Sequence, residues 1–322
     1  MRHPYGVRTR LSVSPQAYAR VATVALVALA VIVLTGAAVR LSGSGLGCPD
    51  WPKCYGRTFA PLETHAVIEY TNRLLSGLVG LTSVGAAVLA FLRRPFRPDL
   101  ALLAALLPLG VLAQAVLGGV TVREHLRPGF VMAHFGLSML ILVAAVALAW
   151  RARYEPGARP RATDRLATWA VRALLPLGAL TIFAGTAATA AGPHAGGMAG
   201  QKINRLDFRG TGTLDWAIHQ HARIAALMGL AAVAVWVLLR WRRAGQELRR
   251  AVAVLLGLLA LQGAIGFVQY ALRLPAEIVW VHVVVASLAW MAVLWSVAAA
   301  GRLAPRALAD RPDRLPLETV RS

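Results

Sequence analysis

Three histidines lie inside long apolar runs of the sequence, where a polar side chain needs a specific reason to be present. His134, His221 and His282 each fall within the first turns of such a run. One interpretation is a polar residue buried between helices or lying at a membrane interface. The other is metal binding, because imidazole is a strong axial ligand of haem iron and two histidines on facing helices can hold a porphyrin inside a four-helix bundle. His221 and His282 form the complete pair, whereas zinc would need clustered third and fourth ligands that the sequence does not supply.

The most informative acidic residue is Glu69, which begins another apolar run. It lies three residues before Asn72, so the two side chains share one face if the run is a helix. A carboxylate one turn outside a porphyrin pocket could accept a proton from a reacting ring substituent or stabilise positive charge on it. A structural role is the alternative, since the helix dipole and Arg73, one turn later, would both stabilise a carboxylate there.

The only two cysteines, Cys48 and Cys54, lie close together in a segment rich in glycine and proline. We expect a disulfide if this segment faces an oxidising compartment. Two free thiols in a metal-handling loop are the alternative. The glycines just before Cys48 permit a close approach of backbone where the preceding apolar run ends.

Composition identifies the solvent around these residues. Of 322 residues, 57% are hydrophobic and only 15% are charged, and the mean hydropathy is +0.60, which is far too apolar for a soluble domain. The excess of 34 Lys and Arg over 14 Asp and Glu would suggest nucleic-acid binding in a soluble protein. Here the cations cluster between apolar runs, where they act as topology signals. We therefore predict an integral membrane protein that binds no nucleic acid.

Eight apolar runs are long enough to cross about 30 Å of hydrocarbon, which takes roughly 20 helical residues. We predict helices, because an open sheet leaves backbone groups unpaired in lipid and the runs lack the alternating pattern of a barrel. The first run should be retained, since no small-residue cleavage site precedes it. The predicted spans are residues 19–40, 66–91, 100–121, 130–150, 168–190, 216–239, 250–271 and 278–300.

The placement of arginine predicts the orientation of these spans. Arginines are dense before the first span, after the second, fourth and sixth spans, and after the eighth, whereas the intervening loops carry fewer cations. Both termini are therefore expected in the cytoplasm of a multi-pass plasma-membrane protein. The expected organisation is a tail at 1–18, a four-helix half at 19–150, a linker at 151–167, a second four-helix half at 168–300 and a tail at 301–322.

The two halves resemble each other in sequence. With an offset of about 149 residues, the segment 69–80 lies over 218–229, so that Asn72 corresponds to His221. Both halves enter the membrane from the same side, so we predict an all-α fold of two pseudo-symmetric four-helix bundles in parallel repeat. Further matches in the same order are Gly36 with Gly185, Gln114 with Gln262, Gly118 with Gly266, and His134 with His282.

The repeat makes the two candidate sites different. The first half presents His134 opposite Asn72, and asparagine is a poor ligand for iron, so we expect this site to be five-coordinate or to use water or another group. His65, two helical turns before Asn72, is a candidate replacement, although we expect it to lie in the loop. A site in which the iron lacks one ligand suits a substrate haem better than a haem that stores electrons. The depth of the histidines places both sites toward the extracytoplasmic side.

Together these residues resemble the haem A synthase family of bacteria and mitochondria, and the resemblance spans nearly the whole apolar region. It implies oxidation of the ring methyl of haem O to the formyl group of haem A by successive hydroxylations, for use in cytochrome oxidase. The residues that carry it are Thr35-Gly36-Ala-Ala-Val-Arg40, Gly43-Ser-Gly45, Cys48-Pro-Asp-Trp-Pro, Glu69-Tyr-Thr-Asn-Arg73, His134-Phe-Gly-Leu-Ser138, His221 and His282.

The resemblance also implies the places of two haems and the partners. Haem B as cofactor would be held in the second half by His221 and His282. The substrate haem would lie in the first half, in a site made by Glu69, Asn72, Arg73 and His134. The family usually has histidine where this chain has asparagine. Implied partners are haem O, the haem O synthase that supplies it, cytochrome oxidase assembly factors, an electron donor that the sequence does not identify, and a second copy of the chain.

Two other functions remain open from the residues. A bis-histidine b-type membrane cytochrome that only transfers electrons explains His221 and His282, but does not require Glu69 or the cysteine loop. A transporter with duplicated halves explains the repeat, but transporters place broken helices and polar groups near the midplane. Here the polar groups lie near one surface.

Overall fold

The computed structural model describes residues 11–156, 158, 161–162, 164–198 and 200–303. These residues include eight helices that are long and apolar enough to cross a membrane. They are α1 (Pro15–Leu41), α2 (Thr64–Leu92), α3 (Pro98–Arg123), α4 (Pro128–Ala152), α5 (Arg165–Ala191), α6 (Thr213–Trp241), α7 (Gln246–Ala271) and α8 (Ala276–Ala299). Every predicted span lies inside one helix, apart from the last residue of the eighth, so the predicted all-α membrane fold is confirmed. The outer parts of the two predicted tails, 1–10 and 304–322, lie outside the described residues.

The helix starts are set by local signals. Ser14 precedes α1, and its hydroxyl accepts a hydrogen bond from the backbone N–H of Ala17 (3.2 Å). Asp164 accepts in the same way from Ala167 (3.0 Å) at the start of α5. Proline is the first residue of α1, α3 and α4. It is favoured there because the N–H groups of a first turn have no partner within the helix, so the missing N–H costs nothing. These signals lie in polar sequence outside the apolar runs, so the helices begin a few residues before the predicted spans.

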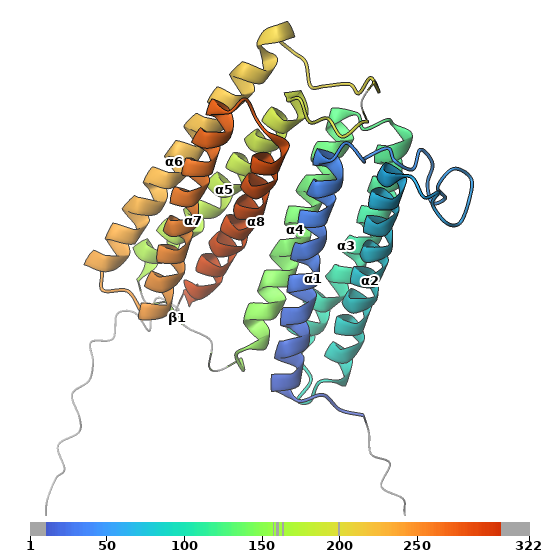
Figure 1. Cartoon of the computed structure of the whole chain (residues 1–322). Coiled ribbons are helices and arrows are strands. Elements are labelled where there is room, and N and C mark those ends of the chain that lie inside the picture. The colour runs from blue at the N-terminus through green and yellow to red at the C-terminus, as the bar shows by residue number, and fades with distance from the viewer. Residues whose placement is uncertain (1–10, 157, 159–160, 163, 199, 304–322) are drawn as a thin grey trace, which may run out of the picture.

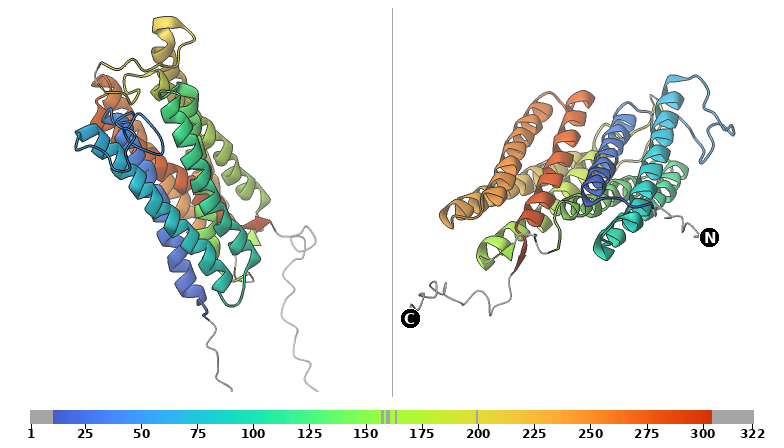
Figure 2. Two further views of the ribbon diagram at one scale, coloured as in Figure 1. Left: turned by 90° about the vertical axis from the view of Figure 1, so that its right-hand side faces the viewer. Right: turned by 90° about the horizontal axis from the view of Figure 1, so that it is seen from below.

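The helices form two bundles, α1–α4 and α5–α8, which stand side by side (Figure 1). In each bundle consecutive helices pack together and the first packs against the fourth, so both bundles close in the same way. Helices α4 and α8 pack against each other between the bundles, flanked by α1 and α5. Figure 2 shows the same two groups of helices from the side and from below. The pseudo-symmetric arrangement predicted from the repeat is present in the fold.

Small side chains let the helices approach closely, and two tryptophans connect the bundles. Trp290 of α8 donates from its indole N–H to the carbonyl oxygen of Met139 in α4 (3.0 Å), and Trp280 donates to that of Leu34 in α1 (3.0 Å). Close packing around small residues is the usual basis of helix association in membranes. Fully buried alanines in the core of the first bundle include Ala22, Ala86, Ala104 and Ala145.

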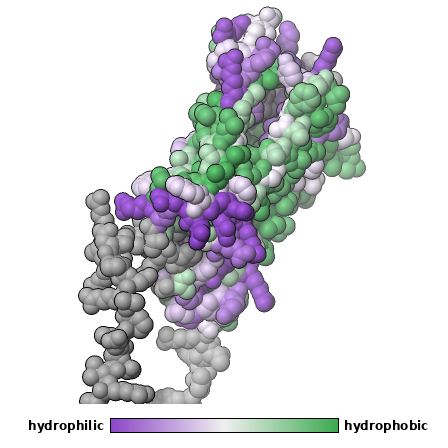
Figure 3. All heavy atoms as spheres, turned by 90° about the vertical axis from the view of Figure 1, so that its left-hand side faces the viewer, coloured by the Kyte–Doolittle hydropathy of each residue, from purple (hydrophilic) through white to green (hydrophobic). Residues whose placement is uncertain are grey.

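The outer surface is apolar around the middle of the molecule. Figure 3 shows a broad hydrophobic region between two hydrophilic ends. On the membrane-spanning helices, large side chains such as Leu81 (71%), Leu102 (66%) and Leu230 (69%) are mostly exposed. A surface of this kind is unfavourable in water and fits a lipid environment.

The loops divide between the two ends of the molecule. The two long loops, residues 42–63 and 192–212, project from one end, and the described chain ends lie at the other (Figure 1). At that second end, β1 (Arg161–Ala162) pairs in parallel with β2 (Arg302–Leu303), which ties the linker between the halves to the segment after α8. A single 3-10 turn, η1 (Gly210–Gly212), precedes α6. The end with the arginine-rich loops is the one predicted to face the cytoplasm, and this orientation stays a prediction.

Candidate functional site

His221 of α6 and His282 of α8 lie opposite each other inside the second bundle, with ring centres 6.2 Å apart. Imidazole nitrogens bind transition metals at about 2 Å, so two axial imidazoles with a metal ion between them have ring centres roughly 6 Å apart. The observed spacing fits that arrangement. Nδ1 of His221 lies 3.1 Å from the carbonyl oxygen of Thr181. Donation from Nδ1 to this carbonyl would leave Nε2 free to bind a metal.

A glycine lies behind the histidine ring in each half. A Cβ atom on Gly266 would lie 3.4 Å from Cε1 of His282, and one on Gly118 would lie 3.2 Å from Cε1 of His134. These are the pairs that the sequence repeat aligned. The absence of a side chain at both glycines lets the imidazole rings pack directly against the backbone of the neighbouring helix.

A glutamine on the preceding helix holds each of these histidines. Gln114 of α3 donates from Nε2 to the carbonyl oxygen of His134 (3.0 Å), and Gln262 of α7 donates in the same way to that of His282 (3.1 Å). Two identical bonds at aligned positions show that the halves repeat in three dimensions as well as in sequence. The depth of both histidines is therefore fixed by the same device.

Several candidate site residues, and the two glutamines bonded to them, carry buried polar atoms without a hydrogen-bond partner. Native proteins leave few such atoms unpaired, so a group of them indicates a place where a bound molecule completes the interactions. Within the described ranges, no group of three or more His, Cys, Asp or Glu is placed to hold a metal ion. The unpaired buried atoms among the described residues include Asn72 Oδ1, Gln114 Oε1, His134 Nδ1, Gln262 Oε1 and His282 Nδ1.

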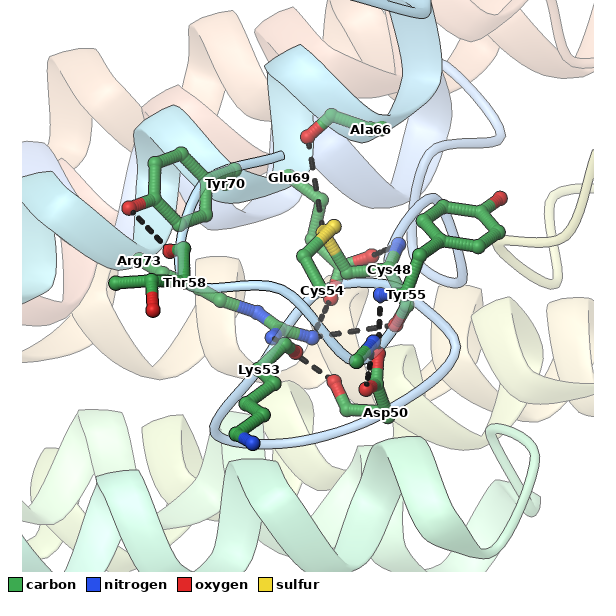
Figure 4. The surroundings of a disulfide bond; sticks show 11 residues. Cys48, Asp50, Lys53, Cys54, Tyr55, Thr58, Ala66, Glu69, Tyr70 and Arg73 are labelled. Atoms are coloured by element: carbon green, nitrogen blue, oxygen red, sulfur yellow. Dashed lines mark hydrogen bonds and ion pairs between the residues drawn. A yellow bond between two sulfur atoms is a disulfide. The ribbon is translucent and has the colours of Figure 1, made fainter. Parts of the chain in front are cut away.

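Glu69 lies in the second turn of α2, and its side chain is only 8% exposed. One carboxylate oxygen accepts a hydrogen bond from the backbone N–H of Cys48 (2.7 Å), and the other pairs with Arg73 (2.5 Å). Figure 4 shows the carboxylate lying between its own helix and the loop. The pairing with Arg73 is the one expected for a structural carboxylate, whereas the bond to the loop was not predicted. The carboxylate is held in one orientation by two partners.

The loop after α1 is closed by a disulfide between Cys48 and Cys54, as predicted (Figure 4). Arg73 of α2 donates to three carbonyl oxygens of this loop, those of Cys48 (3.2 Å), Asp50 (3.0 Å) and Lys53 (3.0 Å). Arg73 is one of the residues predicted for the site, but these contacts are not predictable from the sequence. One guanidinium therefore binds both the loop and the carboxylate of α2.

The outer part of the loop has its own supports. The carboxylate of Asp50 accepts hydrogen bonds from the backbone N–H groups of Gly56 (2.7 Å) and Tyr55 (2.6 Å). These bonds, with Gly56 first, stabilise the charged form and lower the pKa of Asp50 below its usual value of 3.8. Trp51 packs on the end of α3, where a Cβ on Gly119 would lie 2.7 Å from the indole ring. The loop is therefore tied to the ends of α2 and α3.

The expectation that His65 lies in the loop is wrong. Helix α2 begins at Thr64, so His65 lies in its first turn, and its Nδ1 is 2.9 Å from the hydroxyl oxygen of Ser44. Seven helical residues separate it from Asn72, which is about 10 Å along the axis. His65 is thus not beside the position that the repeat places opposite His134.

The two halves are also joined at the end that carries the long loops. The backbone N–H of Gly45 donates to the carbonyl oxygen of Gly196 (2.8 Å), and a Cβ on Gly45 would lie 2.9 Å from that oxygen. Arg40, at the end of α1, donates to the carbonyl oxygens of Thr189 (3.2 Å) and His194 (3.1 Å). The glycines predicted a close backbone approach but not its partner. An arginine at the end of an apolar run was the only sequence signal for the role of Arg40.

The chain matches the sequence profile of a protein family described as cytochrome oxidase assembly protein, over residues 19–67 and 58–294. The chain belongs to this family. The match covers every candidate site residue in both bundles as well as the loop with the disulfide. Membership in the family is consistent with haem-related chemistry in this fold.

Relatives within this family are named Heme A synthase, which confirms the predicted resemblance. The protein of that name from Shewanella oneidensis is 29% identical over 299 residues, which is 80% of this chain and 89% of the relative. One from an Exiguobacterium species is 31% identical over 121 residues, 36% of this chain and 40% of the relative. A Protoheme IX farnesyltransferase from Halobacterium salinarum is 34% identical over 148 residues, 44% of this chain and 31% of that protein.

This member of the cytochrome oxidase assembly family carries its main asymmetry at two aligned positions. His221 in the second half stands where the first half has Asn72, and Ile218 stands where the first half has Glu69. The second bundle therefore contains two histidines whose ring centres are as far apart as expected when both bind one metal ion. The first bundle contains a single corresponding histidine, His134, and a buried carboxylate.

Proposed function

We propose that the chain is a haem A synthase, which oxidises the ring methyl group of haem O to the formyl group of haem A by successive hydroxylations. The asymmetry between the two bundles carries the proposal: the first has only His134 where the second has a pair, and it adds the buried carboxylate of Glu69. A protein that only transfers electrons has no need of this carboxylate or of an unsaturated site. The family and the relatives named Heme A synthase support the same function.

The second bundle holds haem B as the cofactor in this proposal, with His221 and His282 as axial ligands. The ring-centre distance of 6.2 Å and the contact of His221 Nδ1 with the Thr181 carbonyl support this assignment. A haem with two imidazole ligands supplies one-electron transfer. The bond from Gln262 to the backbone of His282 and the packing on Gly266 keep His282 in place, and the Thr181 carbonyl and Gly185 do so for His221.

The first bundle binds haem O, the substrate, with His134 as the ligand of its iron. Gln114 fixes the depth of His134 and Gly118 fixes the position of its ring. Asn72 lies on α2 at the position aligned with the second bundle's histidine. Arg73 keeps the disulfide loop over the outer end, which limits the access of water to the reacting substituent.

Glu69 accepts the proton that is released as the methyl group is oxidised. General-base catalysis requires a carboxylate held within reach of the reacting position. The N–H of Cys48 and the guanidinium of Arg73 hold both oxygens, which supports such a fixed orientation. The disulfide to Cys54 stabilises the loop that supplies the N–H.

Both haem sites lie toward the extracytoplasmic side of the plasma membrane in this proposal, and both termini are cytoplasmic. The arginine-rich loops at one end and the disulfide loop at the other support this orientation. A cysteine introduced at Thr58 should react with a membrane-impermeant thiol reagent in intact cells. A cysteine introduced at Ala244 should react only after permeabilisation, and the reverse pattern would reject the orientation.

The partners follow from the chemistry of the substrate. A prenyltransferase that makes haem O supplies the first bundle, and cytochrome oxidase assembly factors receive the product. The similarity of part of this chain to part of a protein named Protoheme IX farnesyltransferase supports an association of the two activities. An electron donor and a second copy of the chain are the remaining expected partners.

Pigment extraction tests the function directly. Membranes that contain the protein and a supply of haem O should accumulate haem A, measured as the ratio of haem A to haem O. A His134→Ala variant with an intact second bundle should leave haem O unconverted. A wild-type protein that shows the bis-histidine spectrum but forms no haem A under the same conditions would instead be a b-type cytochrome.

A further inference from the structure

The first bundle has open space where the second has a ligand. In the second bundle, a Cβ on Gly185 would lie 3.0 Å from Cε1 of His221, so the imidazole fills the space beside that glycine. Gly36 of α1 is the aligned residue in the first bundle, but no atom lies within 4 Å of a Cβ built on it. The repeat aligns Asn72 with His221, so this half has asparagine, which is shorter than histidine, at the position that fills the space in the second bundle.

Asn72 also presents a polar group that nothing in the described chain satisfies. Its Oδ1 atom is buried and has no hydrogen-bond partner. Its backbone carbonyl accepts a bond from the hydroxyl of Ser76 (2.8 Å), so the helix itself is regular at this point. The side-chain amide can turn about its last bond, so that either the oxygen or the NH2 group faces the interior. Asn72 can thus hydrogen-bond a small molecule beside it.

No neighbouring side chain takes the place of the missing imidazole. His65 is bonded to Ser44 and lies about 10 Å away along α2. Glu69 is one turn from Asn72, but its two oxygens are held by the loop and by the arginine of the same helix. Either residue would have to break existing bonds to reach an iron ion opposite His134.

We propose that the haem site of the first bundle keeps one axial position of the iron open, on the Asn72 side, for a ligand of two or three atoms that Asn72 hydrogen-bonds. The inference rests on the proposed function, because it takes His134 as the ligand on the other face. The support is the single histidine of this half, the open space at Gly36 and the unpaired buried oxygen of Asn72, at positions that the repeat aligns with the site of the second bundle. Access, polarity and hydrogen-bond donors on the open face determine whether a haem binds such a ligand.

Carbon monoxide is the probe for the open position. The full-length protein, loaded with haem B and haem O and reduced, should bind carbon monoxide at the haem that is lost in His134→Ala, and not at the haem held by His221 and His282. Asn72→His should place an imidazole in the space beside Gly36, make this haem low-spin and lower its carbon monoxide affinity at least tenfold.

Asn72→Leu is the matched control for the hydrogen bond, since leucine has nearly the same size but no polar atoms. It should keep carbon monoxide binding and raise the C–O stretching frequency, because the amide donor is lost. An unchanged frequency would reject Asn72 as the hydrogen-bonding partner. If Asn72→His does not accumulate in membranes, the wild-type and Asn72→Leu measurements decide the matter.

The outcomes separate this inference from the function on which it rests. A haem that depends on His134 but binds no carbon monoxide in the wild-type protein would overturn the open position and leave the proposed function intact. A protein that never takes up a haem dependent on His134 would overturn the substrate site itself, and with it the inference.

Discussion

Replacing Glu69 by glutamine separates the chemical role of this carboxylate from its structural role. The variant keeps the size of the side chain and can still accept the bond from the Cys48 N–H, which is 2.7 Å in the wild type. It removes the negative charge beside Arg73. If the carboxylate accepts a proton during the reaction, turnover should fall by about a hundredfold or more. That loss corresponds to about 2.7 kcal/mol of activation free energy.

The surroundings of Glu69 set the size of the competing structural effect. Removing one partner of a fully buried ion pair costs about 3–5 kcal/mol, because the other charge is left unpaired. The side chain of Arg73 is 19% exposed and keeps three carbonyl acceptors in the loop. We therefore expect the free energy of unfolding to fall by only about 1 kcal/mol, as for partly exposed ion pairs. The loop should loosen, while the haem of the second bundle should remain bound.

The control is Arg73→Gln, alone and combined with Glu69→Gln. If Glu69 only holds the loop, Arg73→Gln should lose at least as much activity as Glu69→Gln, because it removes the same ion pair and also three bonds to loop carbonyls. If Glu69 takes the proton, Glu69→Gln should be far less active than Arg73→Gln, and the double variant should stay inactive. The assay is the ratio of haem A to haem O in membranes supplied with haem O. Near wild-type conversion by Glu69→Gln, or equal losses in both single variants, would refute the reasoning.

Three further predictions concern the second bundle and the loop. His282→Ala should turn the low-spin haem signal high-spin or abolish it, measured by absorption and electron paramagnetic resonance, and an unchanged spectrum would contradict the ligand assignment. Cys48→Ser should lower haem A formation but keep the second haem, since only the loop loses a cross-link; full activity would show that the disulfide does not position the site. Because the Gly56 N–H lowers the pKa of Asp50, the loop should keep its stabilisation above the unfolded pKa of about 4 and lose it as pH falls through the folded value. Amide exchange protection in the loop measures this, and Asp50→Asn should show low protection at every pH.

The helices were predictable and their ends were not, for one physical reason. A long apolar run in lipid permits only a helix that satisfies its own backbone. The first turns, by contrast, depend on capping residues such as Ser14 and Asp164, which lie in the polar flanks of the runs. The start of α2 at Thr64 shows the consequence, because a polar flank made His65 look like part of a loop.

The matching positions of the histidines in the two halves were predictable, because the repeat aligns residues that are each uninformative alone. A lone glutamine in an apolar run means little, but Gln114 and Gln262 at aligned positions make the same bond to the following histidine-bearing helix. The contacts between α2 and the loop could not be predicted in this way. Arg73 and Glu69 bind backbone atoms of a segment more than a dozen residues away, and backbone atoms leave no side-chain pattern in a sequence.

If the two bundles hold the haems of the proposed function, the duplicated frame accounts for a reaction at only one of them. The backbone device that fixes histidine depth is the same in both bundles, so the difference must arise from side chains that face the sites. Two histidines saturate an iron ion and leave it suited to electron transfer, whereas Asn72 in place of the second histidine leaves a position free. An open position alone does not provide a base, because the second bundle has Ile218 where the first has Glu69. In the proposed function, two residues on one face of α2, one turn apart, control ligation and proton transfer, and we infer that the chemistry of the first bundle requires both.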